Sequence, residues 1–291
     1  MGSYDVAVAY RIYPKVSKPA SGLPFASDKY LLSEVCLRSF KESLGGLRVK
    51  LWVLLDGCPP EYKDLFRRYF KVEDIVFVEL EHVGNQITFQ RQIDILLSQS
   101  EAETVYFAED DYFYLPQQFP MLLRFLNVTN VDFVSPCDYL DCFRLEIHRH
   151  PISLALFERH YWSTTGSACL TFLTKRETLR ATQHVFRTYS KGNHDCSLWL
   201  SLTKQSVLSP SKLWWCSVSK DRHAQARILA RAWICGWKQI LFGRKRNLWM
   251  PIPGIGTHLD AASISPAFDW LLEISRVVES LHISSLRYQN E

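Results

Sequence analysis

The stretch VYFAEDDY, residues 105–112, places three carboxylates directly after a short apolar run. Residues 105–108 are typical of a β-strand buried on both faces. Three adjacent like charges are unfavourable unless water or a cation compensates them. Mg²⁺ and Mn²⁺ prefer oxygen ligands and bridge readily to a diphosphate, so the triplet is a candidate metal and diphosphate site. A solvated acidic loop is the alternative for such a triplet taken alone.

Two kinds of segment alternate along the preceding residues, and together they predict an α/β fold. Short apolar runs read as strands buried on both faces, and the amphipathic stretches between them read as helices. The strands are expected at 6–9, 49–55, 75–78 and 105–108, and the helices at 27–44, 62–70 and 89–97. This alternation predicts a Rossmann-like, mostly parallel sheet flanked by helices, which binds its ligand beyond the carboxyl ends of the strands.

The second half of the chain is less regular. A strand is expected over 162–174 around Gly166, helices over 175–186, 194–202 and 222–242, and a turn cluster over 251–256. We find no repeat, low-complexity run or linker. The economical interpretation is one compact domain with two functional halves, residues 1–115 and 116–291.

Composition excludes several classes of protein. The net charge of +4 and the lack of a basic tail argue against a nucleic-acid partner. The eight cysteines are scattered without a C-x-x-C pair, which fits a reducing cytosol better than a zinc framework or a disulfide scaffold. The N-terminus lacks a signal-peptide pattern, and no apolar run reaches the roughly 18 to 20 residues that span a bilayer. We expect a cytoplasmic protein.

Two earlier strand ends also carry polar groups. After 49–55 comes Asp56-Gly57, where a carboxylate could accept hydrogen bonds from a base or a ribose; a plain Asp-Gly turn is the alternative. After 75–78 comes a glycine turn at Gly84 that enters a helix containing Arg91. A helix N-terminus with an arginine suits an anionic ligand.

This order of motifs resembles family 2-type glycosyltransferases of the GT-A fold. The resemblance covers roughly the first 115 residues, and it implies that the first half binds a nucleotide-sugar donor and that Glu109-Asp110-Asp111 corresponds to the D-x-D motif. It implies a base contact for Asp56 and a donor-lining position for Arg91. Two departures are Glu109 in place of the first Asp and Gln92 in place of the usual Asn. The donor-binding residues predicted in this way are Tyr10, Arg11, Asp56, Gln86, Arg91, Glu109 and Asp110.

The second half, 116–291, then corresponds to the acceptor side. Gly192-Asn193-His194-Asp195 opens a helix as does the family's acidic motif that carries the catalytic base, with His194 in place of Glu. The resemblance makes Asp195 the base of an inverting reaction, a group that the chemistry requires because a sugar hydroxyl is a poor nucleophile. A helix N-terminal carboxylate stabilised by the helix dipole is the alternative for Asp195. Weaker candidates on the acceptor side are Trp162 and His194.

Residues 253–258 resemble the C-terminal loop that returns a histidine to the metal in several GT-A enzymes. Asp111 and His258 would then form a mixed oxygen and nitrogen site suited to Mn²⁺, or to Mg²⁺ through the carboxylate. An exposed histidine in a glycine-rich loop is the alternative.

The basic stretch 222–246 has several interpretations. Its cations lie among Trp233 and Trp237, so Arg222, Arg227 and Lys238 could close over the diphosphate as a lid. They could also lie at a membrane interface near a lipid-linked acceptor, at the inner face of the membrane, or decorate a surface helix.

Together these features predict a metal-dependent glycosyltransferase. It would move a hexosyl or pentosyl group from a nucleoside diphosphate donor to a hydroxyl of a saccharide or lipid-linked saccharide. A sugar-phosphate nucleotidylyltransferase is disfavoured because residues 10–14 lack that class's glycine-rich loop. A non-catalytic carbohydrate-binding protein is the other alternative, for which the replacements at Glu109 and His194 are the available hints.

Overall fold

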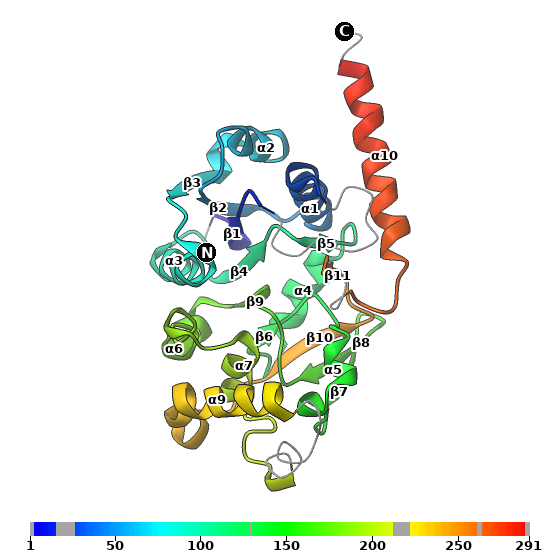
Figure 1. The fold of residues 1–291 in the computed structure, drawn as a ribbon. Helices are drawn as coiled ribbons and strands as arrows, with labels where there is room; N and C mark the ends of the chain where they lie inside the picture. The colour runs from blue at the N-terminus through cyan, green and yellow to red at the C-terminus, as the bar shows by residue number, and fades with distance from the viewer. Residues whose placement is uncertain (1–2, 16–26, 129, 212–221, 261–263, 289–291) are drawn as a thin grey trace.

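A central mixed sheet organises the chain (Figure 1). The computed structural model describes residues 3–15, 27–128, 130–211, 222–260 and 264–288. Within them the strand order is β3-β2-β1-β4-β9-β6-β10-β8-β7. The strands are β1 (Val6–Ile12), β2 (Val49–Asp56), β3 (Ile75–Leu80), β4 (Thr104–Glu109), β6 (Phe133–Val134), β7 (Leu154–Phe157), β8 (His160–Thr165), β9 (Phe172–Lys175) and β10 (Leu248–Ile252).

The sheet is mostly parallel in direction, as predicted. β1 pairs in parallel with β2 and β4, and β2 pairs in parallel with β3. β9 runs antiparallel to both β4 and β6, so β6 and the parallel β10 point the same way as β1. The carboxyl ends of β1, β2 and β4 therefore meet at one edge.

Aromatic contacts show how the helices cover the sheet. On one face Phe40 of α1 (Lys29–Ser43) packs on Tyr10 and Tyr106, with α2 (Glu61–Tyr69) and α4 (Phe119–Leu126) beside it. On the other face Phe107 and Phe172 pack on α3 (Gly84–Ser98), α6 (Arg176–Phe186) and α7 (Asp195–Thr203). The predicted arrangement of a helix-flanked α/β sheet is confirmed.

Further helices lie outside these layers. The two longest are α9 (Arg222–Phe242) and α10 (Trp270–Tyr288), and the short ones are η1 (Val72–Asp74), α5 (Asp141–Arg144), η2 (Glu146–His148) and η3 (Tyr189–Lys191). α9 packs on α7 through Leu229, Ala232 and Ile240, whereas α10 rests on α1 and leads away from the body (Figure 1). Among the described residues, no helix combines the length and apolarity needed to cross a membrane.

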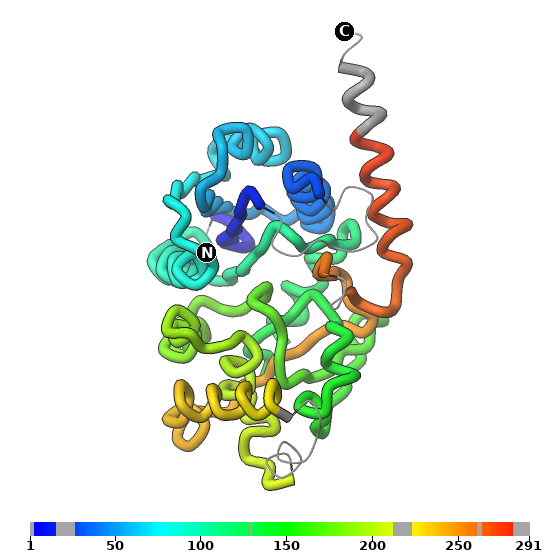
Figure 2. The backbone as a smooth tube through the Cα atoms, in the orientation of Figure 1, coloured from blue at the N-terminus to red at the C-terminus, as the bar shows by residue number. Residues whose placement is uncertain are grey.

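A second, two-stranded sheet joins distant parts of the chain. β5 (Tyr112–Tyr114) follows the acidic triplet at once, and β11 (Gly256–His258) pairs with it antiparallel. The register places His258 opposite Tyr112. In Figure 2 the orange C-terminal segment returns to lie against the green β5 segment. This pairing carries a late segment back to the end of β4.

Three sequence-based expectations about elements are wrong. Residues 162–174 contribute to two strands, β8 and β9, and β6 and β10 lie between these two strands in the sheet. Pro251 and Ile252 belong to β10, where they pair with Trp162 and Tyr161, so the turn cluster begins later than expected. β3 is an edge strand whose residues are mostly part-exposed, because only β2 covers it laterally.

Candidate functional site

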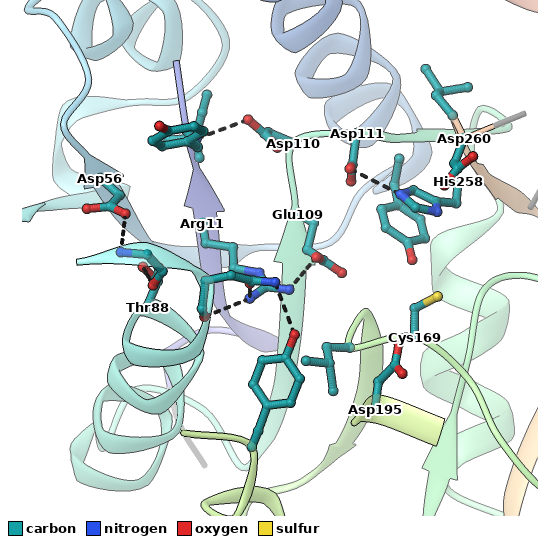
Figure 3. Close-up of a pocket in the computed structure, with 18 of the residues that line it drawn as sticks. Arg11, Asp56, Thr88, Glu109, Asp110, Asp111, Cys169, Asp195, His258 and Asp260 are labelled. Atoms are coloured by element: carbon teal, nitrogen blue, oxygen red, sulfur yellow. Dashed lines mark hydrogen bonds and ion pairs between the residues drawn. The ribbon is translucent and has the colours of Figure 1, made fainter. Parts of the chain in front are cut away.

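A pocket of about 490 Å³ opens where β1, β2 and β4 end (Figure 3). This volume lies within the usual range for small-ligand sites. The edge contributes Arg11, Asp56 and Glu109, the short β5–β11 sheet contributes His258, and α7 contributes Asp195. The pocket occupies the carboxyl edge where open α/β sheets bind ligands.

Each carboxylate of the acidic triplet has a different partner. Glu109 accepts from Thr171 Oγ1 at 2.8 Å and forms an ion pair with Arg11. Asp110 accepts from the Tyr13 backbone N–H at 3.1 Å and pairs with Lys29 Nζ at 2.7 Å. Asp111 faces His258 instead. The charge repulsion within the triplet is thus relieved by a separate cation for each member.

One oxygen of Asp110, Oδ2, makes both of these contacts within the protein. Asp110 is 8% exposed, and burial raises the pKa of its carboxyl while Lys29 opposes that rise. Lys29 is the first residue of α1, where the helix dipole disfavours a cation, so the ion pair with Asp110 offsets an unfavourable position. A lysine at the start of a helix is unfavourable, and this position of Lys29 was the sequence feature that indicated an acidic partner for it.

Asp111 and His258 form the least satisfied part of the site. Asp111 Oδ2 lies 3.1 Å from His258 Nε2, and the His258 ring stacks on Tyr112 with centroids 4.8 Å apart. Burial alone would raise the pKa of Asp111, but His258 lowers it to about 2; burial alone would lower the pKa of His258, but Asp111 raises it to about 9. Asp111 Oδ1 and His258 Nδ1 are buried without a hydrogen-bond partner among the described residues. Such orphaned polar atoms at a pocket call for an explanation, and a ligand or ion is one.

A metal centre built from protein side chains alone is not apparent. In the described ranges no group of three or more His, Cys, Asp or Glu side chains could hold an ion by itself. The pair Asp111 and His258 offers one carboxylate oxygen and one imidazole nitrogen. That set fits an ion that takes its remaining ligands from water and substrate phosphates, as Mg²⁺ sites in proteins often do.

Arg11 brings a guanidinium group to the pocket. Beyond Glu109, it donates to the side-chain and backbone oxygens of Asn85, and it lies over the Phe89 ring at 5.8 Å from the centroid. Asn85 in turn donates to the Tyr189 hydroxyl at 3.1 Å. The guanidinium is therefore held in one orientation at the pocket wall.

Asp56 shapes the turn that opens α3. It is 3% exposed, and its two oxygens accept from the backbone N–H groups of Val83 at 2.8 Å and Gly84 at 2.9 Å. Gly57 has φ +67°, and a Cβ there would lie 2.0 Å from the His82 ring. The carboxylate lines the pocket, while its contact with a base stays a prediction.

Asp195 begins α7 and lies on the opposite wall, beside Cys169 (Figure 3). Its Oδ1 accepts from the Cys196 N–H at 2.7 Å. Burial raises the pKa of this carboxyl, and nearby Glu109 adds to the rise. A raised pKa brings a carboxylate closer to the range in which a general base works.

Several predicted donor residues lie elsewhere. Tyr10 is 1% exposed and packs on Phe40 and Phe66, because alternate strand residues face opposite sides and Arg11 takes the pocket side. Gln86 and Arg91 are exposed and do not line the pocket. The phase of α3 turns Gln92 inward, where it donates to the carbonyls of Ala9 and Ala108.

The acceptor and lid candidates are also displaced. Trp162 is fully buried and stacks on Phe125 at 3.7 Å, so it is a core residue. His194 is exposed and outside the pocket, because it is the extended residue before α7. Arg227 and Lys238 are exposed on α9, none of whose described residues lines the pocket. Arg222 begins α9, and its side chain lies outside the described part.

The pocket also holds residues that sequence reasoning missed. They come from loops and helix ends whose position only the fold determines: Tyr13, His82, Asn85, Cys169, Leu170, Tyr189 and Asp260. Asn85 stood next to the glycine turn already noted, and Asp260 stood two residues after His258. The others carry no recognisable local signal.

Comparison with known proteins yields distant structural likeness only. No protein-family model matches the chain, and no curated protein matches its sequence. Two structures of the galactosyltransferase LgtC match at TM-scores of 0.35 and 0.42 with 11% identity; they cover 68% and 94% of this chain, and 65% and 95% of LgtC.

Two further proteins are similar at the same level. One, described as a nucleotide-diphospho-sugar transferase from Desulfovibrio desulfuricans G20, has a TM-score of 0.42, 12% identity and coverage of 80% of this chain and 99% of its own. The other, a cytidylyltransferase from Leptospira borgpetersenii serovar Hardjo-bovis, has a TM-score of 0.33, 10% identity and coverage of 63% and 64%. All these TM-scores are below 0.5, and we base no functional inference on them.

Proposed function

We propose that the protein transfers a glycosyl group from a nucleoside diphosphate donor to an acceptor hydroxyl. The observation that carries this proposal is the unsatisfied Asp111–His258 pair in one pocket with Arg11 and Asp195. The first pair offers an ion-binding surface, Arg11 a fixed cation for phosphate, and Asp195 a carboxylate with raised proton affinity. A site for transfer from a diphosphate needs these three functions.

Asp111 and His258 are the proposed ligands of Mn²⁺ or Mg²⁺, and His258 would release its proton when the ion binds. The orphaned Asp111 Oδ1 is the acceptor that a cation would satisfy. Bound there, the ion would supply charge neutralisation for a diphosphate leaving group. Around it, Arg11 provides guanidinium N–H donors from the end of β1, held in place by Glu109 and Asn85. Glu109 thus orients the arginine, which is a different role from the D-x-D carboxylate it resembles.

Asp195 is the proposed base. Its carboxylate would accept the proton of the attacking hydroxyl as the new glycosidic bond forms and the bond to the diphosphate breaks. Attack opposite the leaving group inverts the anomeric centre. The hydrogen bond from Cys196 and the packing of α7 fix the carboxylate at the wall facing Asp56. A saccharide or lipid-linked saccharide would present the hydroxyl, and the transferred group would be hexosyl or pentosyl.

A ligand screen tests the proposal directly. The melting temperature is measured with UDP, GDP, CMP and dTDP, each with and without Mn²⁺, because a ligand that binds the folded state raises it. We expect a Mn²⁺-dependent rise with at least one nucleotide that Asp111→Ala abolishes and Asp195→Ala preserves. No rise with any nucleotide, or a rise that Asp111→Ala leaves intact, would rule out this use of the pocket.

Product analysis separates transfer from the competing activities. Incubation with nucleotide sugars and simple saccharides should release nucleoside diphosphate in proportion to glycoside formed, with an inverted anomeric proton signal. A nucleotidylyltransferase would instead form nucleotide sugar from a sugar phosphate and a nucleoside triphosphate. A carbohydrate-binding protein would show ligand binding without turnover.

A further inference from the structure

The exposed side of α9 carries apolar and cationic side chains together. Ile234 is 72% exposed, Trp237 45%, Leu241 50% and Phe242 79%. Exposed surface helices normally carry polar side chains on this side, and an exposed group of large apolar residues marks an interaction site. Nothing in the transferase chemistry uses this group.

The cations occupy the same side of the helix. Arg227, Ile234, Lys238 and Leu241 follow a spacing of seven, four and three residues, which keeps them on one side of an α-helix. Arg227 and Lys238 are exposed, and Arg244 and Lys245 continue the exposed cations just past the helix end. We call the set Arg227, Ile234, Trp237, Lys238, Leu241, Phe242, Arg244 and Lys245 the α9 face.

The opposite side of α9 is fully used by the fold. Leu229, Ala232 and Ile240 are buried against α7 and its surroundings. Ser197 Oγ of α7 donates to the Ile228 carbonyl at 2.8 Å, and Trp233 Nε1 donates to the Val207 carbonyl at 3.0 Å. The α9 face is therefore presented outward by a firmly anchored helix and is not left over from loose packing.

Charge decides what the α9 face binds. From Arg222 to His258 the sequence contains no Asp or Glu, so no acidic side chain of this segment balances its cations. A second copy docked through the same face would set cation against cation, which is unfavourable. A nucleic acid would pair with the cations but would give the exposed Leu241 and Phe242 no apolar environment.

We propose that the α9 face docks on an anionic lipid surface. Trp237 and Phe242, whose ring centroids lie 6.4 Å apart, would enter the headgroup region, and the four cations would pair with lipid phosphates. α9 would lie along the membrane plane. Because α7 lies directly beneath α9 and begins with Asp195, docking would keep the pocket close to the lipid surface.

Vesicle co-sedimentation of the full chain tests this proposal. The vesicles are phosphatidylcholine alone or an equal mixture of phosphatidylcholine and phosphatidylglycerol. We expect binding to the mixed vesicles only, weakened by salt because surface charges are screened. Lys238→Glu with Lys245→Glu should lower the partition coefficient by at least roughly 25-fold, about fivefold for each charge. Trp237→Ser with Phe242→Ser should also abolish binding.

Matched variants control for charge and apolarity in general. Arg180→Glu with Lys71→Glu makes the same charge change on exposed positions elsewhere, and Leu154→Ser with Leu156→Ser removes exposed leucines from β7. Both should bind as the wild type does, and a melting-temperature measurement confirms that every variant is folded. Wild-type failure to bind mixed vesicles, or equal loss in the control variants, overturns the proposal. Binding to duplex DNA would also overturn the proposal if the charge reversals abolish that binding and Trp237→Ser with Phe242→Ser leaves it intact.

Discussion

Asp111 and His258 stand 147 positions apart in the sequence, and their side chains meet at 3.1 Å. Antiparallel pairing of β11 with β5 accounts for the meeting, since it sets His258 opposite Tyr112 and bonds the Leu259 N–H to the Asp111 carbonyl at 2.9 Å. The imidazole is held further by stacking on Tyr112. The Asp111–His258 pair at the end of β4 therefore forms only when β11 has paired with β5.

Substitution of either member of this pair should weaken Mn²⁺ binding. We expect Asp111→Asn and His258→Ala each to reduce Mn²⁺ affinity at least roughly tenfold, since even outer-shell changes at metal sites cost that much. Electron paramagnetic resonance of free Mn²⁺, titrated with protein and nucleoside diphosphate, measures the affinity. Glu73→Gln removes an exposed carboxylate in η1 and serves as the control. Unchanged affinity in both site variants would remove the pair from metal binding.

Asp195→Asn should lower kcat while leaving donor binding intact. Loss of a general base typically costs about 10²- to 10⁴-fold in rate, and the amide keeps the size of the side chain. Steady-state kinetics with varied donor separates kcat from KM. The control is Glu177→Gln, which removes a first-turn carboxylate from α6. If Asp195 only stabilises its helix through the dipole, both variants lose a few tenths to about 1 kcal/mol of stability and neither loses rate.

The first half of the site was accessible to sequence reasoning because strand ends are local features. Buried apolar runs predicted the ends of β2 and β4 to within about one residue, whereas β1 continues past its expected end at residue 9 to Ile12. Parallel topology requires the three ends to share an edge. Asp56 and Glu109 consequently line one pocket, together with Arg11 from the end of β1. His258 was reached only through family resemblance, because the pairing of β11 with β5 leaves no local pattern.

Two of the site assignments were wrong because the sequence does not show how α3 is rotated or which residues Trp162 contacts. Arg91 and Gln92 are adjacent, and a helix turns about 100° between them, so the packing of α3 decides which one faces the sheet. Gln92 is the residue that faces the sheet, where its side chain donates hydrogen bonds to β1 and β4. Trp162 lies in the core instead of at the acceptor side because its ring stacks on Phe125 of α4, a pairing that the local sequence does not show.

Gly236→Ala should destabilise the protein although alanine favours helix. A Cβ at Gly236 would lie 2.4 Å from Ser201 Oγ and 2.8 Å from Ser201 Cβ, where α9 crosses α7. Overpacking of this kind costs about 1 to 3 kcal/mol, more than the roughly 1 kcal/mol that alanine gains in a helix. Chemical denaturation measures the loss. Ser201→Gly removes the clashing atoms, so the double variant should be more stable than Ser201→Gly alone, and a destabilised double variant would contradict this account.

His148 should make the folded state sensitive to mild acid. Burial, with a smaller effect of His150, lowers the pKa of His148 from 6.5 to about 4, and the residue is 8% exposed. Between those values the unfolded chain binds a proton that the folded chain does not, so the free energy of unfolding falls as pH falls. The contribution of neutral, buried His148 to the free energy of unfolding is fully present above about pH 6.5 and is lost as pH falls to about 4. It amounts to about 3 kcal/mol at 1.36 kcal/mol per pKa unit.

Buried carboxyls act in the opposite sense as pH falls, because burial raises the pKa of Asp110, Asp138 and Asp195 and the folded state then binds protons more readily than the unfolded chain. The informative quantity is therefore the difference between wild type and His148→Phe, measured by urea denaturation from pH 4 to pH 7. That difference should change by about 3 kcal/mol across the window in favour of the variant at low pH. The control, His184→Gln, removes an exposed imidazole and should run parallel to wild type. A His148→Phe curve that also ran parallel to wild type would show that His148 does not stay neutral in the folded protein.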